Sequence, residues 1–258
     1  MTAPRLVLVL GMHCGGTSIT TRALAAMGVD LGGNLMQQAR RNPDGLLEDT
    51  AIVGINEALL ASSGLKWHSL KEVAPVRWDE ADSLPLRQQA RQLLESRMAL
   101  YRPFGFKDPR TSRLLPFWRS TIDEITGDAG CIVVARNPMA VAQSLSRRNR
   151  FTLEHGLELW HLHMKPLVGS IDGTWKKVVV EYDRLVDEPE SQLRRIAAAM
   201  NLDTPSTPAV AEFCERFPDR TRRHSTAGSV DKWPVHILDT WNELRRLSGV
   251  DKVLGDER

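Results

Sequence analysis

A short apolar run that ends in a glycine-rich turn, with a helical pattern directly after it, constrains the fold of this chain more than any other feature. Residues 5–10 (RLVLVL) are mostly apolar and include β-branched valines, and the turn from Gly11 to Gly16 follows at once. Thr17 to Met27 then carries apolar residues at helical spacing. A strand, a tight turn and a helix in this order are the beginning of a βα unit.

The same alternation recurs along the chain. Further strands are predicted at Phe104–Phe106, Cys131–Ala135 and Val178–Tyr182. Predicted helices cover residues 49–62, 84–100, 113–125, 139–147, 153–168 and 187–200. The stretch CIVVA is apolar throughout, as a strand of a parallel sheet is when both of its faces are covered. The pattern therefore predicts an α/β fold, a doubly wound parallel sheet flanked by helices on both faces.

The length of 258 residues favours one domain, and no repeat, low-complexity tract or linker divides the chain. Residues 203–233 are turn-rich and basic, and a helix is predicted from about His236 to Leu247. We expect residues 203–258 to form a flap and a helix of a single domain that spans residues 1–258.

The charge balance and the cysteines exclude several classes of protein. The net charge of +2 indicates neither a nucleic acid nor a membrane as a general partner. Cys14, Cys131 and Cys214 lie far apart, which argues against a disulfide framework and fits a reducing compartment. No apolar run approaches the ~18–20 residues of a membrane span. We expect a cytoplasmic protein, and the sequence does not indicate its oligomeric state.

The turn GMHCGGTS, residues 11–18, has the G-x-x-x-x-G spacing of a phosphate-binding P-loop. Glycines let the backbone wrap an anion, so that N–H groups and a helix N-terminus point at it. The hydroxyl of Ser18 could touch a phosphate oxygen. A nucleoside triphosphatase needs Lys at the position of Thr17, so the sequence argues against ordinary ATP chemistry. The position between a strand and a helix favours an anion site over a turn without a ligand.

A second candidate phosphate site lies after the third predicted strand. Arg136 closes the run CIVVA, and Ser144 follows eight residues later, about two turns into the next helix. Open α/β sheets bind ligands at the carboxyl ends of their strands. An Arg that caps the sheet edge beside an incidental Ser is the alternative interpretation, and the glycine turn favours the phosphate site.

The stretches GMHCGGTS, FKDPR and VARNPMAVAQSL, in this order, resemble sulfotransferases that use PAPS (3′-phosphoadenosine 5′-phosphosulfate). The similarity is to the bacterial branch related to tyrosylprotein and carbohydrate sulfotransferases, and it covers about residues 5–200. It implies a P-loop-type α/β fold and an enzyme that moves a sulfuryl group from PAPS to a hydroxyl. It also implies the product 3′-phosphoadenosine 5′-phosphate, and a carbohydrate or a small-molecule natural product as the acceptor.

The resemblance also implies roles for individual residues. It assigns the first loop, His13, Cys14, Gly15, Gly16, Thr17 and Ser18, to the 5′-phosphosulfate. It assigns Arg136 and Ser144 to the 3′-phosphate. Lys107 is similar to a lysine near the bridging oxygen of the departing sulfate, and Tyr182 to a tyrosine near the nucleotide. Arg223 and Lys232 resemble residues of a loop that closes over the nucleotide.

One residue departs from the family pattern. The family usually has Arg or Lys at the position of Cys14, where a cation stabilises charge on the leaving phosphate. A thiol with an ordinary pKa of ~8.5 is neutral and cannot replace that cation. Either Lys107 and nearby arginines supply the positive charge instead, or the enzyme is slow or inactive, or the sequence is altered at this site.

Sulfuryl transfer needs a base for the acceptor proton. Glu48 is the first candidate, because related enzymes place a catalytic glutamate in a segment after the first helix. Its alternative role is that of a carboxylate at a helix N-terminus, which Asp49 fills at least as well. His68 is the second candidate, since its ordinary pKa suits a base. His161 and His163 are two residues apart and do not share a helix face, so a metal pair is not expected there.

Two other functions remain open from the residues alone. A P-loop kinase of a small metabolite is supported only by the glycine turn and opposed by Thr17. A non-catalytic nucleotide-binding module is supported by Cys14. Tryptophans, Trp67 and Trp118 among them, could line an acceptor cleft, although packing in the core is the stronger interpretation for each.

Overall fold

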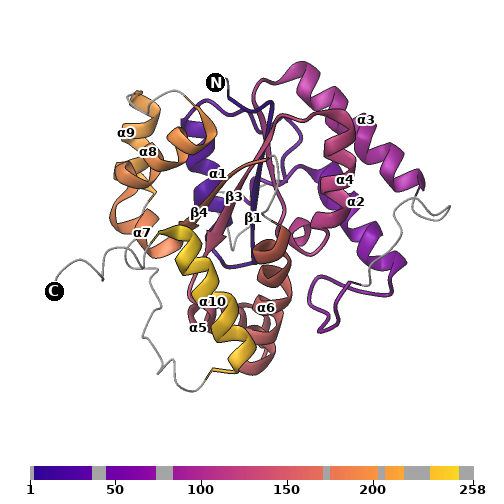
Figure 1. Ribbon diagram of the computed structural model, residues 1–258, viewed down its shortest axis with the longest axis vertical. Helices are drawn as coiled ribbons and strands as arrows, with labels where there is room; N and C mark the ends of the chain where they lie inside the picture. The colour runs from indigo at the N-terminus through magenta and orange to yellow at the C-terminus, as the bar shows by residue number, and fades with distance from the viewer. Residues whose placement is uncertain are drawn as a thin grey trace.

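Four parallel strands form the centre of the computed structural model, which describes residues 3–36, 45–73, 84–170, 175–202, 207–217 and 233–249. The order in the sheet is β2-β1-β3-β4 (Figure 1). The strands are β1 Leu6–Gly11, β2 Phe104–Lys107, β3 Ala129–Ala135 and β4 Lys176–Glu181. Each neighbouring pair is parallel. The predicted doubly wound parallel sheet is confirmed.

Alternate residues of β1, β3 and β4 enter two different cores, because successive side chains of a strand point to opposite faces. Leu6, Leu8 and Leu10 of β1 belong to one core, and Val7 and Val9 belong to the other. This explains why β1 and β3 contain no charged residue: both faces of the sheet are covered by helices.

The helices divide between these two faces (Figure 1). One face carries α1 Thr17–Ala26, α7 Tyr182–Asp187, α8 Pro189–Met200 and α9 Pro208–Arg216. The other carries α2 Thr50–Ser62, α3 Leu84–Leu100, α4 Leu115–Ile125, α5 Pro138–Asn149, α6 Leu153–Ser170 and α10 Val235–Ser248. A short 3-10 helix, η1 Pro109–Ser112, directly follows β2 and Asp108.

Two details differ from the sequence prediction. Tyr182 does not end the last strand but begins α7, so the chain turns one residue earlier than the run VVVEY indicates. Residues 208–216, predicted as part of a turn-rich segment, form α9. Thr207 caps this helix, with its Oγ1 accepting from the N–H of Val210 at 3.3 Å, and Phe213 packs into the core. Its nine residues are too few for a clear periodic pattern.

Three strands end at the same edge of the sheet and bring the candidate residues together. β1 runs into the glycine turn, β2 ends at Lys107, and β3 is followed by Arg136. β1 lies between β2 and β3, and the helices that follow β1 and β3 cover opposite faces. A crevice at the carboxyl ends of such strands is where open α/β sheets bind ligands.

Candidate active site

The glycine turn after β1 leaves the N-terminus of α1 without a side-chain cap. The N–H of Gly15 donates to the carbonyl of Met12 at 2.9 Å, and a side chain at Gly15 would meet that carbonyl at 2.7 Å. Gly16, the N-cap of α1, has a φ of +92° and no side chain that could cap the helix. The first N–H groups of an uncapped helix attract anions. The uncapped start of α1 is compatible with an anion site, and the role of the turn toward an anion stays a prediction.

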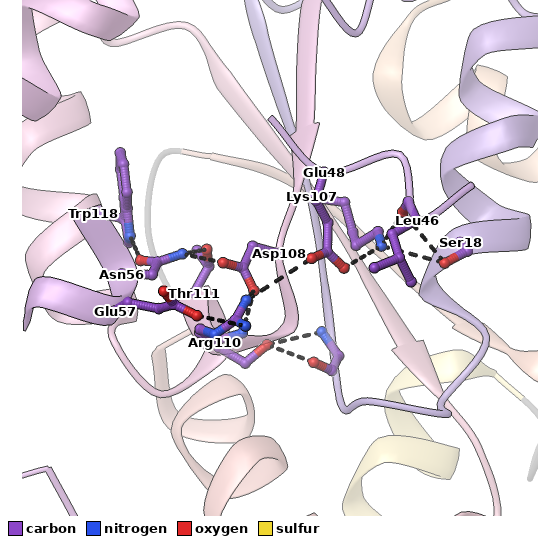
Figure 2. A network of polar contacts seen from close by, with 12 residues as sticks. Ser18, Leu46, Glu48, Asn56, Glu57, Lys107, Asp108, Arg110, Thr111 and Trp118 are labelled. Atoms are coloured by element: carbon purple, nitrogen blue, oxygen red, sulfur yellow. Dashed lines mark hydrogen bonds and ion pairs between the residues drawn. The ribbon is translucent and has the colours of Figure 1, made fainter. Parts of the chain in front are cut away.

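Lys107 lies at the centre of the site and is almost completely buried. Its Nζ donates to Glu48 Oε1 at 2.7 Å, to Ser18 Oγ at 3.2 Å and to the carbonyl of Leu46 (Figure 2). Ser18 belongs to the first turn of α1, and Glu48 directly precedes Asp49, the N-cap of α2. The ammonium of Lys107 thus joins the glycine turn to the segment that carries the candidate base.

Burial dominates the titration of this ion pair. Loss of water raises the pKa of Glu48, and the Lys107 cation only partly opposes this shift. The same loss of water lowers the pKa of Lys107, against the effect of the Glu48 carboxylate. A carboxylate with a raised pKa is a stronger base than one in water, so Glu48 has the property that a proton acceptor needs.

A second cation, Arg110, lies on the other side of Glu48. Its guanidinium is 3.8 Å from Glu48 Oε2, 2.9 Å from Asp108 Oδ1 and 3.2 Å from Glu57 Oε1 (Figure 2). Lys107 and Arg110 therefore contact different oxygens of the Glu48 carboxylate.

A chain of buried hydrogen bonds fixes Asp108, the main partner of Arg110. Trp118 Nε1 donates to Asn56 Oδ1 at 2.7 Å, and Asn56 Nδ2 donates to Asp108 Oδ2 at 2.9 Å and to Thr111 Oγ1 at 3.0 Å (Figure 2). Asp108 is completely buried and also caps η1 through the N–H of Arg110. Buried polar groups that are satisfied in this way rigidify their surroundings.

Arg136 turns back from the end of β3 toward the glycine turn. One guanidinium nitrogen donates to the carbonyl of Cys14 at 2.8 Å, and the guanidinium carbon lies 4.2 Å from the centre of the Tyr182 ring. The same ring covers Gly16, where an added Cβ would approach it to 2.2 Å. Arg136, Tyr182, Cys14 and Gly16 thus form one unit. Ser144 is half-buried in the second turn of α5, and its role toward a 3′-phosphate stays a prediction.

The side chain of His13 packs against other aromatic rings. Its ring lies 4.4 Å from the ring of Trp67 and 5.8 Å from that of His163 on α6, measured between ring centres. Burial, with smaller effects of cations that include Lys107 and Arg110, lowers the pKa of His13 well below its usual value. Aromatic contacts therefore hold the His13 ring, and its lowered pKa disfavours the charged form.

His68, the second candidate base, lies in the loop that follows α2 and is half-buried. Its ring packs against Trp67 and Phe151, at 5.4 Å and 5.7 Å between ring centres. It lines a pocket of about 260 Å³ together with Trp67 and Arg110. Trp67 is partly buried, so it both packs against the core and lines this pocket, whereas Trp118 is completely buried.

Sequence reasoning assigned no role to three residues of the site, Asn56, Arg110 and His163. Arg110 belongs to the stretch FKDPR, which was a usable signal, whereas Asn56 and His163 carry no local pattern. Arg223 and Lys232, the predicted residues of a loop over the nucleotide, lie outside the described residues. Within those residues no cluster of His, Cys, Asp and Glu could hold a metal, and no helix could span a membrane.

The whole chain is similar in fold to solved sulfotransferase structures. The sulfotransferase domain from the olefin synthase of Synechococcus PCC 7002 superimposes with a TM-score of 0.52 at 15% identity, over 100% of this chain and 98% of that one. The sulfotransferase domain from the curacin biosynthetic pathway gives 0.51 at 13% identity, over 98% and 99%. Sulfotransferase STF9 from Mycobacterium avium gives 0.50 at 16% identity, over 100% and 78%. No protein-family model and no curated protein matches the sequence. The chain therefore has the P-loop-type α/β fold of these structures.

Proposed function

We propose that this protein is an enzyme that transfers a sulfuryl group from PAPS to a hydroxyl acceptor. The observation that carries the proposal is the position of Lys107, whose buried ammonium contacts both Ser18 at the start of α1 and the carboxylate of Glu48. An anion on the glycine turn and a hydroxyl at Glu48 would meet at this lysine. The fold similarity to sulfotransferases supports the same reaction.

The residues of the site fit a phosphosulfate group. Gly16 leaves the N-terminus of α1 uncapped, and the hydroxyl of Ser18 and the ammonium of Lys107 lie beside it. These groups can donate hydrogen bonds to phosphate and sulfate oxygens. The guanidinium of Arg136, which lies against the same turn, supplies a cation for a 3′-phosphate.

The proposed reaction balances without any further reactant. The acceptor oxygen forms a bond to sulfur, and the bond between sulfur and the bridging oxygen breaks with its electron pair left on 3′-phosphoadenosine 5′-phosphate. Glu48 takes the acceptor proton, which its raised pKa favours. Lys107 stabilises the charge that develops on the bridging oxygen. Arg110 takes part in holding the Glu48 carboxylate in place.

A screen with labelled PAPS over classes of hydroxyl acceptor tests the proposal, with Glu48→Gln as the variant that keeps the shape of the side chain. We expect transfer by the wild-type protein and a large loss in the variant. Calorimetry with 3′,5′-bisphosphoadenosine and with ADP separates this reaction from phosphoryl transfer, since a kinase would prefer ADP. Equal transfer by both proteins would exclude Glu48 as the base.

A non-catalytic nucleotide-binding protein is the second candidate function, and Cys14 is the observation that favours it. It places a thiol in a turn suited to an anion, where the sulfotransferases that the turn resembles usually carry a cation. Tight binding of the bisphosphate without turnover of PAPS on any acceptor class would favour this second function.

A further inference from the structure

Tyr182 contacts both groups to which the proposed function assigns the phosphates of the nucleotide, the glycine turn and Arg136. The register of the sheet brings it there, because Ala135 of β3 pairs with Glu181 of β4. The next residues along the chain, Arg136 and Tyr182, therefore leave two neighbouring parallel strands side by side. The position of Tyr182 beside Arg136 thus follows from the pairing of β3 with β4.

The ring of Tyr182 holds the guanidinium of Arg136. The guanidinium carbon lies 4.2 Å from the ring centre, and one guanidinium nitrogen donates to the carbonyl of Cys14 at 2.8 Å. The face of an aromatic ring attracts a cation without using the hydrogen bonds that the N–H groups of a guanidinium make in their own plane. This attraction is strongest where water is excluded, and Arg136 and Tyr182 are each only 7% exposed.

The same ring fits against the glycine turn. An added Cβ at Gly16 would approach Cδ2 of Tyr182 to 2.2 Å and Cε2 to 2.9 Å, so the ring packs at a position that only glycine leaves open. Gly16 is the N-cap of α1, and the first N–H groups of this helix are the proposed site of the 5′-phosphosulfate. One rigid ring therefore contacts the N-cap at one phosphate site and the cation of the other.

A nucleotide with phosphates at both its 3′ and 5′ positions uses both sites only if their separation matches its own. An aromatic side chain has few torsions and keeps its shape, so it is suited to fix such a separation. We propose that Tyr182 is a positioning residue that sets Arg136 relative to the glycine turn and thereby selects adenosine 3′,5′-bisphosphates over adenosine 5′-phosphate. This inference rests on the proposed function. The ring acts through Arg136, and the hydroxyl of Tyr182 is not required.

Substitutions of Tyr182 separate the ring from the hydroxyl. Tyr182→Phe keeps the ring, whereas Tyr182→Met fills the space with a flexible apolar chain that has no aromatic face. Tyr182→Leu is a second variant without a ring, and thermal unfolding shows which of the two is folded. Trp175→Met is the matched control, because Trp175 directly precedes β4 at the end opposite Tyr182, and its ring centre lies 5.7 Å from the guanidinium carbon of Arg119.

The first measurement is calorimetry with 3′,5′-bisphosphoadenosine and with adenosine 5′-phosphate, and the quantity compared is the ratio of the two affinities. We expect Tyr182→Met to lower this ratio by about tenfold, through weaker binding of the bisphosphate. Tyr182→Phe and Trp175→Met should keep the wild-type ratio. In an Arg136→Ala background, Tyr182→Met should lower the ratio no further, because two residues that act as a unit are not additive.

Four results would overturn the inference. A wild-type ratio near one would mean that the 3′-phosphate is not selected. An equal loss in Tyr182→Phe would mean that the hydroxyl itself contacts the nucleotide. Equal losses for both nucleotides in Tyr182→Met would mean that the ring only supports the glycine turn. A full further loss in the Arg136→Ala background would mean that Tyr182 does not act through Arg136.

The second measurement is sulfate transfer from PAPS, which separates this inference from the proposed function. We expect Tyr182→Met to raise the KM for PAPS by about tenfold with little change in kcat, because the 3′-phosphate is remote from the bond that breaks. A fall in kcat at unchanged KM would contradict the positioning role. If the affinity ratio changes as expected but the wild type sulfates no acceptor, the proposed function fails and the selection of the nucleotide stands. If transfer occurs and the ratio is unchanged in Tyr182→Met, sulfotransfer stands and this inference fails.

Discussion

Lys107 Nζ lies 2.7 Å from Glu48 Oε1, and both side chains are at least 95% buried. These residues come from opposite sides of the site, Lys107 from the end of β2 and Glu48 from the segment before α2. The pair places a cation that can stabilise a leaving group beside a carboxylate that can accept a proton. Both roles can be separated by measurement.

Lys107→Met should lower kcat for sulfate transfer by on the order of 10²–10³, because it removes a cation from the site where charge develops in the transition state. Affinity for the product 3′,5′-bisphosphoadenosine should fall much less. Lys165, a surface lysine paired with Glu72 at 2.6 Å, provides the control Lys165→Met, which should behave like wild type. Near-normal turnover of Lys107→Met would make Lys107 a structural ion-pair residue only.

The pH profile tests Glu48 as the base. A base works deprotonated, so kcat/KM should fall as the pH drops through the pKa of Glu48. Because burial raises this pKa, the acidic limb of the pH profile should lie above the usual carboxylate value of about 4.3. The Lys107 cation lowers the pKa of Glu48, so the residual activity of Lys107→Met should show the limb at higher pH. A limb that moves to lower pH would contradict this assignment, as would one that persists in Glu48→Gln.

Much of the fold is predictable from the sequence because each strand has an apolar centre and is followed by a helical pattern. Residues 6–10 and the stretch CIVVA are apolar throughout because the sheet is covered on both faces. The end of β4 was misplaced, since Tyr182 is as common in strands as the valines before it. The ring of Tyr182 covers Gly16, and this tertiary contact has no signature near Tyr182 in the sequence.

The site was predictable only in part, for a related reason. The glycine turn is local and shows in its spacing, whereas the contact between Lys107 and Glu48 joins residues 59 positions apart. The orientation of Arg110 depends on Asp108, which in turn is held by Asn56 on another helix. No periodic pattern in the sequence predicts such a chain of contacts between residues that lie far apart along it. The position of His13 in the turn follows from the sequence, whereas the packing of its ring on Trp67 is visible only in the structure.

Arg136→Ala should weaken the binding of 3′,5′-bisphosphoadenosine by about tenfold to a hundredfold, since a hydrogen bond from a charged group contributes roughly 1.5–3 kcal/mol. Binding of adenosine 5′-phosphate should hardly change. Arg136 also donates to the carbonyl of Cys14, so Arg136→Lys is the control that keeps a cation near the turn. Equal losses for the two nucleotides in calorimetry would mean that Arg136 only supports the turn and does not select the 3′-phosphate.

Buried histidines should make the fold sensitive to acid. Burial lowers the pKa of His163 to about 3, while in the unfolded chain it is about 6.5. The unfolded state therefore binds one more proton between these values. The contribution of His163 to stability is complete above pH 6.5 and is lost as the pH falls toward 3, by about 1.4 kcal/mol per pH unit. Urea unfolding of His163→Phe from pH 7 to pH 4.5 should show a slope smaller by about this amount, and an unchanged slope would exclude this role.

Cys14→Arg should raise kcat for sulfate transfer, because the sulfotransferases that the glycine turn resembles usually carry a cation at this position. Cys14 already carries a side chain at a φ of +61°, so an arginine at this position needs no change of the backbone. The backbone carbonyl of residue 14 can therefore still accept the hydrogen bond from Arg136, and only the side chain differs. The new guanidinium would act where charge develops in the transition state, so kcat should gain more than affinity, by about tenfold or more. Cys214→Arg on α9 is the control and should leave turnover unchanged. A loss of activity in Cys14→Arg would mean that Lys107 and Arg110 already supply the charge that the reaction needs, and that Cys14 is an adaptation to their presence.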